Sequence, residues 1–348
     1  MSRRPRIGFL GVGWIGRHRM EAMIATGAID AAAIADPSPD ALAEAAALAP
    51  SAARAASLDG MLALDLDGVV VATPSAFHAE QTIRALEAGV AVFCQKPLGR
   101  HAGEAAAAVD AARAADRLLS VDLSYRFTAA VERIREAIRG GALGRVHAVD
   151  LVFHNAYGPD KPWFYDKSRS GGGCVMDLGV HMIDLALWLL DFPGVDDVDS
   201  CLFAGGRPLD PSCDEVEDHA FATLRLETGA VVRLACSWRL HAGRDAVIAA
   251  EFYGSEGGAA LRNVAGSFYD FTAERFAGTA HRTLAGPPDA WGGRAAAEWA
   301  RRLADGARFD PAAEQLVAVA RVMDRIYGRA PPVAASMDLL PAGAERAA

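Results

Sequence analysis

Apolar and polar residues alternate with two different periods along the first third of the chain. Short apolar runs typical of buried parallel strands are separated by alanine-rich stretches of helical character. Because strands that alternate with helices form right-handed βαβ units, the pattern predicts a doubly wound parallel sheet in an α/β domain over residues 1–123. The predicted strands are 7–11, 31–36, 68–74, 90–94 and 118–122, and the predicted helices are 15–26, 39–49, 76–88 and 102–116.

The pattern changes after residue 123, where longer strands begin to follow one another without helices between them. Such runs are typical of an antiparallel sheet. Residues 124–330 are therefore predicted to form an α+β domain with a large, mainly antiparallel open sheet, and residues 331–348 a C-terminal tail. The predicted elements are helices 129–141, 175–190 and 311–327, strands 144–155, 195–206, 217–227, 230–239 and 246–254, and a loop at 156–173.

Composition narrows the classes of function. The 348 residues are 52% hydrophobic, enough for two cores, and the net charge of −9 comes without a basic block, which argues against nucleic-acid and membrane partners. The five cysteines are scattered without a CxxC pair, so we expect no disulfide framework, no metal site and a cytoplasmic location. The basic and apolar start is interpreted as a first strand rather than a signal peptide, and no run is long enough to cross a bilayer.

A glycine motif, Gly11-x-Gly13-x-x-Gly16, lies between the first predicted strand and the first predicted helix. In this context Gly11 permits a tight turn, Gly13 lets the backbone approach a pyrophosphate, and Gly16 lets helix and strand pack closely. The helix start, with Trp14 and Ile15, offers free N–H groups and a positive dipole end to the phosphates. The motif predicts a dinucleotide-binding Rossmann domain.

The second predicted strand ends in Asp36, where a carboxylate can accept hydrogen bonds from the adenosine ribose hydroxyls. A carboxylate would repel a 2′-phosphate, and the residues that follow are Pro37 and Ser38 rather than an arginine. The sequence therefore favours NAD over NADP.

Polar residues follow two further strands of the predicted parallel sheet. Thr73, Pro74 and His78 come after one strand, and Gln95 and Lys96 come after the next. Because ligands of doubly wound sheets bind outside the carboxyl ends of the strands, these residues are expected to line the nicotinamide end of the cofactor site.

Asp177 and His181 are spaced i, i+4 in the predicted helix at 175–190, and therefore share one face. A histidine with an ordinary pKa near 6.5 can act as a general base. An amphipathic helix with a hydrogen-bonded core histidine is the alternative, and the spacing alone leaves both open.

With these motifs the chain resembles the Gfo/Idh/MocA oxidoreductases, the group of glucose–fructose oxidoreductase and inositol dehydrogenase. The resemblance covers nearly the whole chain. Besides the glycine motif it rests on "ATPSAFH" at 72–78, Lys96-Pro97, "YRF" at 125–127, "SGGGCVMDLGVH" at 170–181 and the final helical "VMDRIYGRA". It implies a homodimer or homotetramer formed through the open face of the second sheet.

The resemblance implies a catalytic set of Lys96, Asp177 and His181. In such a set His181 would take the proton of a secondary alcohol, and Lys96 would stabilise the developing alkoxide. Asp177 would orient His181 or a substrate hydroxyl. The chain departs from the family at Gln95, where relatives usually have Glu. Gln95 either tunes Lys96 or the cofactor preference, or is a tolerated isostere.

Four further residues are predicted to bind substrate: Arg126, His154, Tyr157 and Trp163. The last three lie in or beside a loop that combines polar groups with aromatic faces, which suits a polyhydroxylated ring. Together with Lys96, Asp177 and His181 they predict reversible oxidation of a ring hydroxyl of a sugar, an inositol or a sugar derivative. The alternatives are a non-catalytic regulator that binds NAD or sugar, and an enzyme that cycles a tightly bound cofactor, for sugar–sugar oxidoreduction or redox-assisted glycoside cleavage.

Overall fold

A computed structural model describes residues 3–210 and 213–329, and in this part of the chain six parallel strands form the first sheet. The strand order is β3-β2-β1-β4-β5-β6, with the order reversing beside β1 as in doubly wound folds. Strands β1, β2, β4, β5 and β6 agree with the predicted apolar runs. The strands are β1 (Arg6–Leu10), β2 (Asp30–Ala35), β3 (Ala53–Arg54), β4 (Gly68–Val71), β5 (Ala91–Cys94) and β6 (Leu119–Val121).

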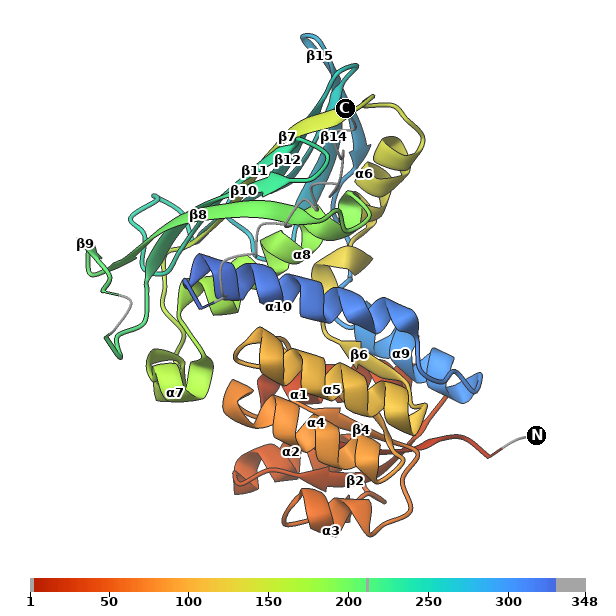
Figure 1. Cartoon of the computed structure of the whole chain (residues 1–348). Helices are drawn as coiled ribbons and strands as arrows, with labels where there is room; N and C mark the ends of the chain where they lie inside the picture. The colour runs from red at the N-terminus through yellow and green to blue at the C-terminus, as the bar shows by residue number, and fades with distance from the viewer. Residues whose placement is uncertain (1–2, 211–212, 330–348) are drawn as a thin grey trace, which may run out of the picture.

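Helices connect these strands and cover the sheet (Figure 1). The predicted helices are confirmed with small changes at their ends. The short strand β3 and the short helix α3 were not predicted, because both are too brief to show a hydrophobic period. The helices are α1 (Trp14–Ala25), α2 (Pro39–Leu48), α3 (Leu58–Leu62), α4 (His78–Glu87) and α5 (Ala102–Ala115).

The second sheet has nine strands in the described residues, in the order β15-β14-β13-β12-β7-β11-β10-β8-β9. All neighbours are antiparallel except β7 and β11, which run parallel. The large, mainly antiparallel sheet is confirmed. The strands are β7 (Val146–Asn155), β8 (Val195–Ala204), β9 (Arg207–Pro208), β10 (His219–Leu226), β11 (Val231–Ser237), β12 (Ala246–Gly254), β13 (Gly258–Asn263), β14 (Phe271–Ala277) and β15 (Ala280–Ala285).

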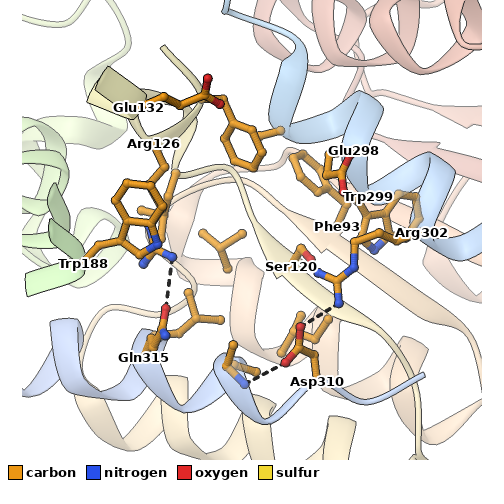
Figure 2. A pocket seen from close by; sticks show the side chains of 18 of the residues that line it. Phe93, Ser120, Arg126, Glu132, Trp188, Glu298, Trp299, Arg302, Asp310 and Gln315 are labelled. Carbon is orange, nitrogen blue, oxygen red and sulfur yellow. Dashed lines mark hydrogen bonds and ion pairs between the residues drawn. The ribbon is translucent and has the colours of Figure 1, made fainter. Parts of the chain in front are cut away.

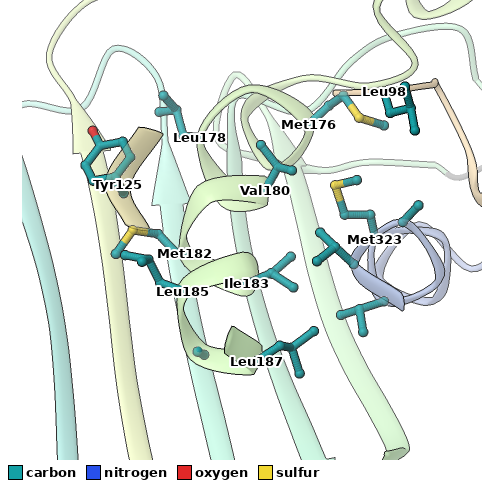
Figure 3. Packing of buried hydrophobic residues seen from close by; sticks show 14 of the residues in the cluster. Leu98, Tyr125, Met176, Leu178, Val180, Met182, Ile183, Leu185, Leu187 and Met323 are labelled. Carbon is teal, nitrogen blue, oxygen red and sulfur yellow. The ribbon is translucent and has the colours of Figure 1, made fainter. Parts of the chain in front are cut away.

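Helices pack on one face of this sheet and fill the space between the two domains (Figure 1). Residues of α8 are buried on nearly every side, and Met323 of α10 packs close to them in a shared apolar cluster (Figure 3). The helices of this part are α6 (Ala129–Arg139), α7 (Lys167–Ser170), α8 (Val180–Leu189), α9 (Arg294–Ala304) and α10 (Glu314–Ile326).

Helix α9 returns to the first domain, although it lies far along the chain. It packs against α1, and its Trp299 joins the cluster of Ile7, Phe9 and Phe93. The indole lies so close to Gly68 that a Cβ there would meet its ring at 2.7 Å. The core of the first domain is therefore completed by a residue of the last third of the chain.

The stretch Lys167–Leu189, which spans α7, η4 (Val175–Gly179) and α8, is long and apolar enough to cross a membrane by length and composition alone. In the folded protein 83% of its most apolar part is buried, as expected for a core helix. The sequence analysis missed this stretch as a candidate because it predicted a loop up to residue 173.

Candidate active site

The carboxyl ends of the first sheet open into a cleft of about 930 Å³ whose walls come from both domains. The first domain contributes every residue predicted to bind the cofactor, and the second contributes Trp163, Gly173 and Asp177 among others. The predicted cofactor residues on the wall are Gly11, Gly13, Trp14, Ile15, Gly16, Asp36, Thr73, Pro74, His78, Gln95 and Lys96.

The glycine loop has the shape that a dinucleotide requires. Gly11 has φ +86°, a left-handed conformation that favours glycine, and a Cβ on Gly16 would lie 2.0 Å from the carbonyl oxygen of Gly11. A Cβ on Gly13, by contrast, would meet no atom within 4 Å. Gly11 and Gly16 therefore close the turn, while Gly13 leaves open the space that a pyrophosphate would occupy.

Helix α1 begins at this loop with its N–H groups available. Among the described residues no side chain caps its N-terminus, and its first turn carries no acidic residue. The carboxylate of Asp36 accepts hydrogen bonds from the N–H groups of Val12 (2.8 Å) and Ser38 (2.9 Å), which fixes it beside the loop. The residues present thus fit NAD, with a positive helix end for phosphate and a fixed carboxylate for ribose.

His78 is buried at the wall of the cleft and joins two turns. Its Nδ1 lies 2.7 Å from the carbonyl oxygen of Pro97, and its Nε2 lies 2.6 Å from that of Thr73. Burial lowers the pKa of His78. The ring therefore ties the turn after β4 to the segment that carries Lys96.

Lys96 and Asp177 meet across the cleft. The Nζ of Lys96 donates to the carboxylate Oδ1 and to the backbone carbonyl of Asp177, both at 2.7 Å. The other carboxylate oxygen accepts a hydrogen bond from Nε1 of Trp238 at 3.1 Å. The two side chains are mostly buried, with 19% and 17% of their surface exposed. This contact brings together two of the three predicted catalytic residues, one from each domain.

Asp177 lies in a short π-helix, η4 (Val175–Gly179), rather than in the α-helix that was predicted there. π-Helical turns occur often at functional sites. The buried carboxylate of Glu217 holds the start of this turn, because it accepts hydrogen bonds from the N–H groups of Gly173 and Val175, both at 2.9 Å. Tyr327 also donates to Glu217, at 2.7 Å.

His181 follows the π-helix at the start of α8. Its Nδ1 is buried and has no hydrogen-bond partner in the described part of the chain, and its ring lies 4.9 Å from that of Tyr125. Burial, together with the positive charges of Lys96 and Arg19, holds the pKa of His181 well below its usual value. The ring is therefore neutral at neutral pH. The expected contact between His181 and Asp177 is not among the hydrogen bonds of the described residues, and His181 is not among the described residues that line the cleft.

The residues predicted to bind substrate separate into two groups. Trp163 lines the cleft and stacks on Phe164 with 3.8 Å between ring centroids. His154 and Tyr157 lie outside the cleft lining: His154 pairs with Ser237 at 2.8 Å, and the exposed Tyr157 donates to Asp245 at 2.5 Å. Burial lowers the pKa of His154 to about 4, with His219 adding to the effect.

Arg126 lies away from the cleft. Its Nε donates to Asp184 at 2.8 Å, and its Nη1 donates to Gln315 at 3.1 Å. It lines a separate cavity of about 560 Å³, where Figure 2 shows it beside Trp188 and Gln315. Its guanidinium group forms an ion pair with the buried carboxylate of Asp184. Arg126 therefore makes a structural contact and does not line the cleft.

Several residues near the cleft were missed by the sequence analysis, among them Asp122, Trp238 and Glu217. Asp122 had a signal, because it ends the apolar run at 118–122 as Asp36 ends an earlier one. Trp238 and Glu217 lie at the ends of strands of the second sheet and reach Asp177 or its turn only through the tertiary fold. Within residues 3–210 and 213–329, no group of three or more His, Cys, Asp and Glu is arranged to hold a metal ion.

Comparison with protein families matches both domains. Residues 5–123 match a model described as an oxidoreductase family with an NAD-binding Rossmann fold. Residues 131–260 match the model of the GFO/IDH/MocA C-terminal domain.

Curated relatives include sugar and inositol dehydrogenases. D-glucoside 3-dehydrogenase of Escherichia coli (strain K12) is 32% identical over 211 residues, which are 58% of this chain and 60% of that protein. Inositol 2-dehydrogenase of Rhizobium meliloti (strain 1021) is 30% identical over 261 residues, 74% of this chain and 76% of that protein. The chain spans only 54 to 60% of the length of several relatives, the first of these two included.

A solved structure supports the same relationship over both domains. Levoglucosan dehydrogenase in complex with NADH and levoglucosan superposes with a TM-score of 0.80 and 25% sequence identity. The match covers 94% of this chain and 97% of that one.

Proposed function

Because the chain belongs to the Gfo/Idh/MocA family, whose first domain is an NAD-binding Rossmann fold, we propose that it is an NAD-dependent dehydrogenase. Its substrate is a sugar, an inositol or a related derivative, and the reaction is the reversible oxidation of a ring hydroxyl to a ketone. The names of the relatives, which include a glucoside and an inositol dehydrogenase, support this substrate class.

The observation that carries the proposal is the contact between Lys96 and Asp177 beside the glycine loop. Lys96 follows β5 in the cofactor domain, and Asp177 belongs to the second domain. The contact places an ammonium group, a carboxylate and the fixed wall of a dinucleotide cleft within one site. A regulator without catalysis would have no need to keep these groups together with a neutral histidine.

Each residue of the set has a distinct task. His181 is neutral at neutral pH, and its Nδ1 has no hydrogen-bond partner within residues 3–210 and 213–329, so we assign it the role of accepting the hydroxyl proton. Lys96 donates to the substrate oxygen as negative charge develops on it, and Asp177 holds the ammonium group until substrate arrives. Bound NAD supplies the hydride acceptor.

The substrate is held between the cofactor wall and the loop of the second domain that carries Trp163. An indole face packs well against the C–H face of a sugar ring, while the carboxylate of Asp177 and the ammonium group of Lys96 bond its hydroxyls. We assign no substrate contact to Arg126.

The test is a screen of absorbance at 340 nm with inositols, aldoses, glucosides, amino sugars and sugar acids, each with NAD and with NADP. Steady formation of NADH with one of these classes supports the proposal. Absence of NAD reduction with all of them, in a protein that binds NADH, would overturn it. A cofactor that co-purifies and turns over without release would instead favour the enzyme that cycles a tightly bound cofactor.

We also propose that the enzyme is a cytoplasmic homodimer or homotetramer. All five cysteines, which lie in the described residues, are free thiols, in keeping with a reducing compartment. On the second sheet, Phe221 of β10 and Tyr253 of β12 are large and exposed, and strand alternation places their neighbours Ala220 and Phe252 in the core. Light scattering of wild type and Phe221→Glu tests this surface, and a monomeric wild type would exclude it.

A further inference from the structure

The carboxylate of Asp122 is buried at the end of β6, with 1% of the residue exposed, and receives hydrogen bonds from three elements. Its Oδ2 accepts from Nε of Arg19 on α1 at 2.5 Å and from Nε2 of Gln95 after β5 at 2.6 Å. Its Oδ1 accepts from the hydroxyl of Ser124. The carboxylate thus links the helix of the glycine loop to the strand end that carries Lys96.

Gln95 is fixed on both its main chain and its side chain. Its N–H donates to the carbonyl of Val71 at 2.8 Å, and the N–H of Asp122 donates to Cys94 at 2.9 Å, so the ladder between the strands continues to this point. The side-chain bond to Asp122 then anchors the residue immediately before Lys96. A shift of Gln95 would move the attachment point of the ammonium group relative to Asp177.

The amide at position 95 is specified by Asp122. A glutamate side chain in the same conformation would bring a carboxylate oxygen to within 2.6 Å of the Asp122 carboxylate, which is itself buried. Two carboxylates at that distance, one of them buried, repel each other strongly when both are ionised, so ionising both or protonating one costs free energy.

We propose that Gln95 and Asp122 are one coupled positioning unit for Lys96, in which the buried carboxylate is supplied by the end of β6 and the end of β5 must carry an uncharged donor. The carboxylate serves two purposes: it neutralises the buried Arg19, and it holds the Lys96 segment against α1. For its effect on turnover the inference rests on the proposed dehydrogenase activity.

The position of the unit explains why it acts on the site. Arg19 is 7% exposed, and its positive charge is one of the causes that lower the pKa of His181. Without Asp122 that cation would lose its carboxylate partner and keep, among the described residues, its contacts with His18 at 2.7 Å and with the hydroxyl of Ser124 at 3.2 Å. In this proposal the unit therefore controls both the position of Lys96 and the effect of the Arg19 charge on the pKa of His181.

The experiment compares Gln95→Glu, Asp122→Asn, and the double variant Gln95→Glu/Asp122→Asn, which moves the carboxylate from one strand end to the other. We expect each single change to lower the melting temperature by about 5 °C or more and kcat by about tenfold or more. The double variant is expected to recover most of both losses. Gln95→Ala, which leaves the pair of Arg19 and Asp122 intact, is expected to lower kcat by about tenfold with a smaller loss of melting temperature.

Gln315→Glu is the matched control, because it makes the same chemical change beside Arg126, outside the cleft. It should leave kcat and NADH affinity within about twofold of wild type, in line with most surface changes. A wild-type rate and melting temperature in Gln95→Glu would overturn the inference. So would a double variant that is no better than the worse single variant, or that fails to fold.

Melting temperature and NADH fluorescence titration need no sugar substrate. If the screen for a substrate fails, recovery of stability and NADH affinity in the double variant still decides whether positions 95 and 122 are coupled. Melting temperature and NADH affinity therefore test whether positions 95 and 122 are coupled, whereas the substrate screen tests the proposed activity.

Discussion

The Nζ of Lys96 lies 2.7 Å from both the carboxylate and the backbone carbonyl of Asp177, so one ammonium group connects the cofactor domain to the second domain. A substrate oxygen that reaches the ammonium group must share it with Asp177 or displace one of these bonds. In the proposed reaction Asp177 holds the ammonium group in place before substrate binds, and the developing alkoxide then accepts a hydrogen bond from it.

This relationship predicts different outcomes for the two partners. Lys96→Ala removes the donor and should lower kcat by about 10² to 10³, because an oxyanion donor is lost. Asp177→Asn keeps the size and one acceptor, so a smaller loss of kcat is expected. Turnover on the best substrate of the screen measures both, with NADH fluorescence titration as the check that the cofactor site survives. Near-wild-type turnover in Lys96→Ala would exclude its catalytic role.

The depressed pKa of His181 fixes the direction of the pH profile. Because burial and two nearby cations hold this pKa well below 6.5, the imidazole is already neutral at pH 6.5. The rate of alcohol oxidation, kcat/KM, should therefore be insensitive to His181 from pH 6.5 upward and fall only at lower pH, as the ring becomes protonated. A pH profile with wild type and His181→Ala measures this, and an acidic limb centred above pH 7 would contradict it.

The glycine loop offers a matched pair of substitutions. Gly16→Ala places a Cβ 2.0 Å from a backbone oxygen, so it should lower both stability and NADH affinity. The added methyl group of Gly13→Ala meets no atom of the described residues within 4 Å, so this change should leave the melting temperature nearly unchanged. It should nevertheless weaken NADH binding by about tenfold or more, since the methyl group enters the space for the pyrophosphate. Equal NADH affinity in Gly13→Ala and wild type would argue against this placement of the cofactor.

Glu217 is predicted to support the turn that carries Asp177. Glu217→Gln keeps the shape but replaces one acceptor by an NH₂ group facing a backbone N–H, so a destabilisation of about 1–3 kcal/mol is expected. Because the affected turn leads to Asp177, kcat should fall more than NADH affinity.

The comparison variant for Glu217 is Tyr327→Phe, which removes one donor to Glu217 and the acceptor of the Met176 N–H (3.2 Å) but leaves the bonds from Gly173 and Val175 to Glu217 in place. Tyr327→Phe should lower kcat less than Glu217→Gln does. Chemical denaturation of both variants measures the accompanying loss of stability. Equal losses of kcat in the two variants would show that the Tyr327 hydroxyl supports the turn as much as the backbone bonds to Glu217 do.

Much of the first domain could be predicted from the sequence because its signals are local. A buried parallel strand is a short apolar run, and its end is marked by the residue that changes character, such as Asp36 or Lys96. The strands of the second domain were harder to predict from the sequence. Strands β13 to β15 were missed, and β15 is largely exposed, so it shows no hydrophobic alternation.

In the candidate site, too, only the features with a local sequence signal could be predicted. Lys96 and Asp177 are recognisable from their motifs, but their contact depends on the packing of two domains. Arg126 illustrates the converse, because its place after β6 suggested a substrate contact while the fold supplies Asp184 as its partner. The bond between Gln95 and Asp122 joins residues 27 positions apart, and no local period encodes it.

The return of α9 has a consequence for the order in which the chain folds. Trp299 is 1% exposed and packs with Phe93 at 5.9 Å between ring centroids, inside the domain that is synthesised first. Domains usually fold as they leave the ribosome, from the N-terminus onward. We therefore expect the first domain to keep part of its apolar surface uncovered until α9 has been made. A fragment that ends near residue 123 should therefore be prone to aggregation, although it contains every strand of its own sheet.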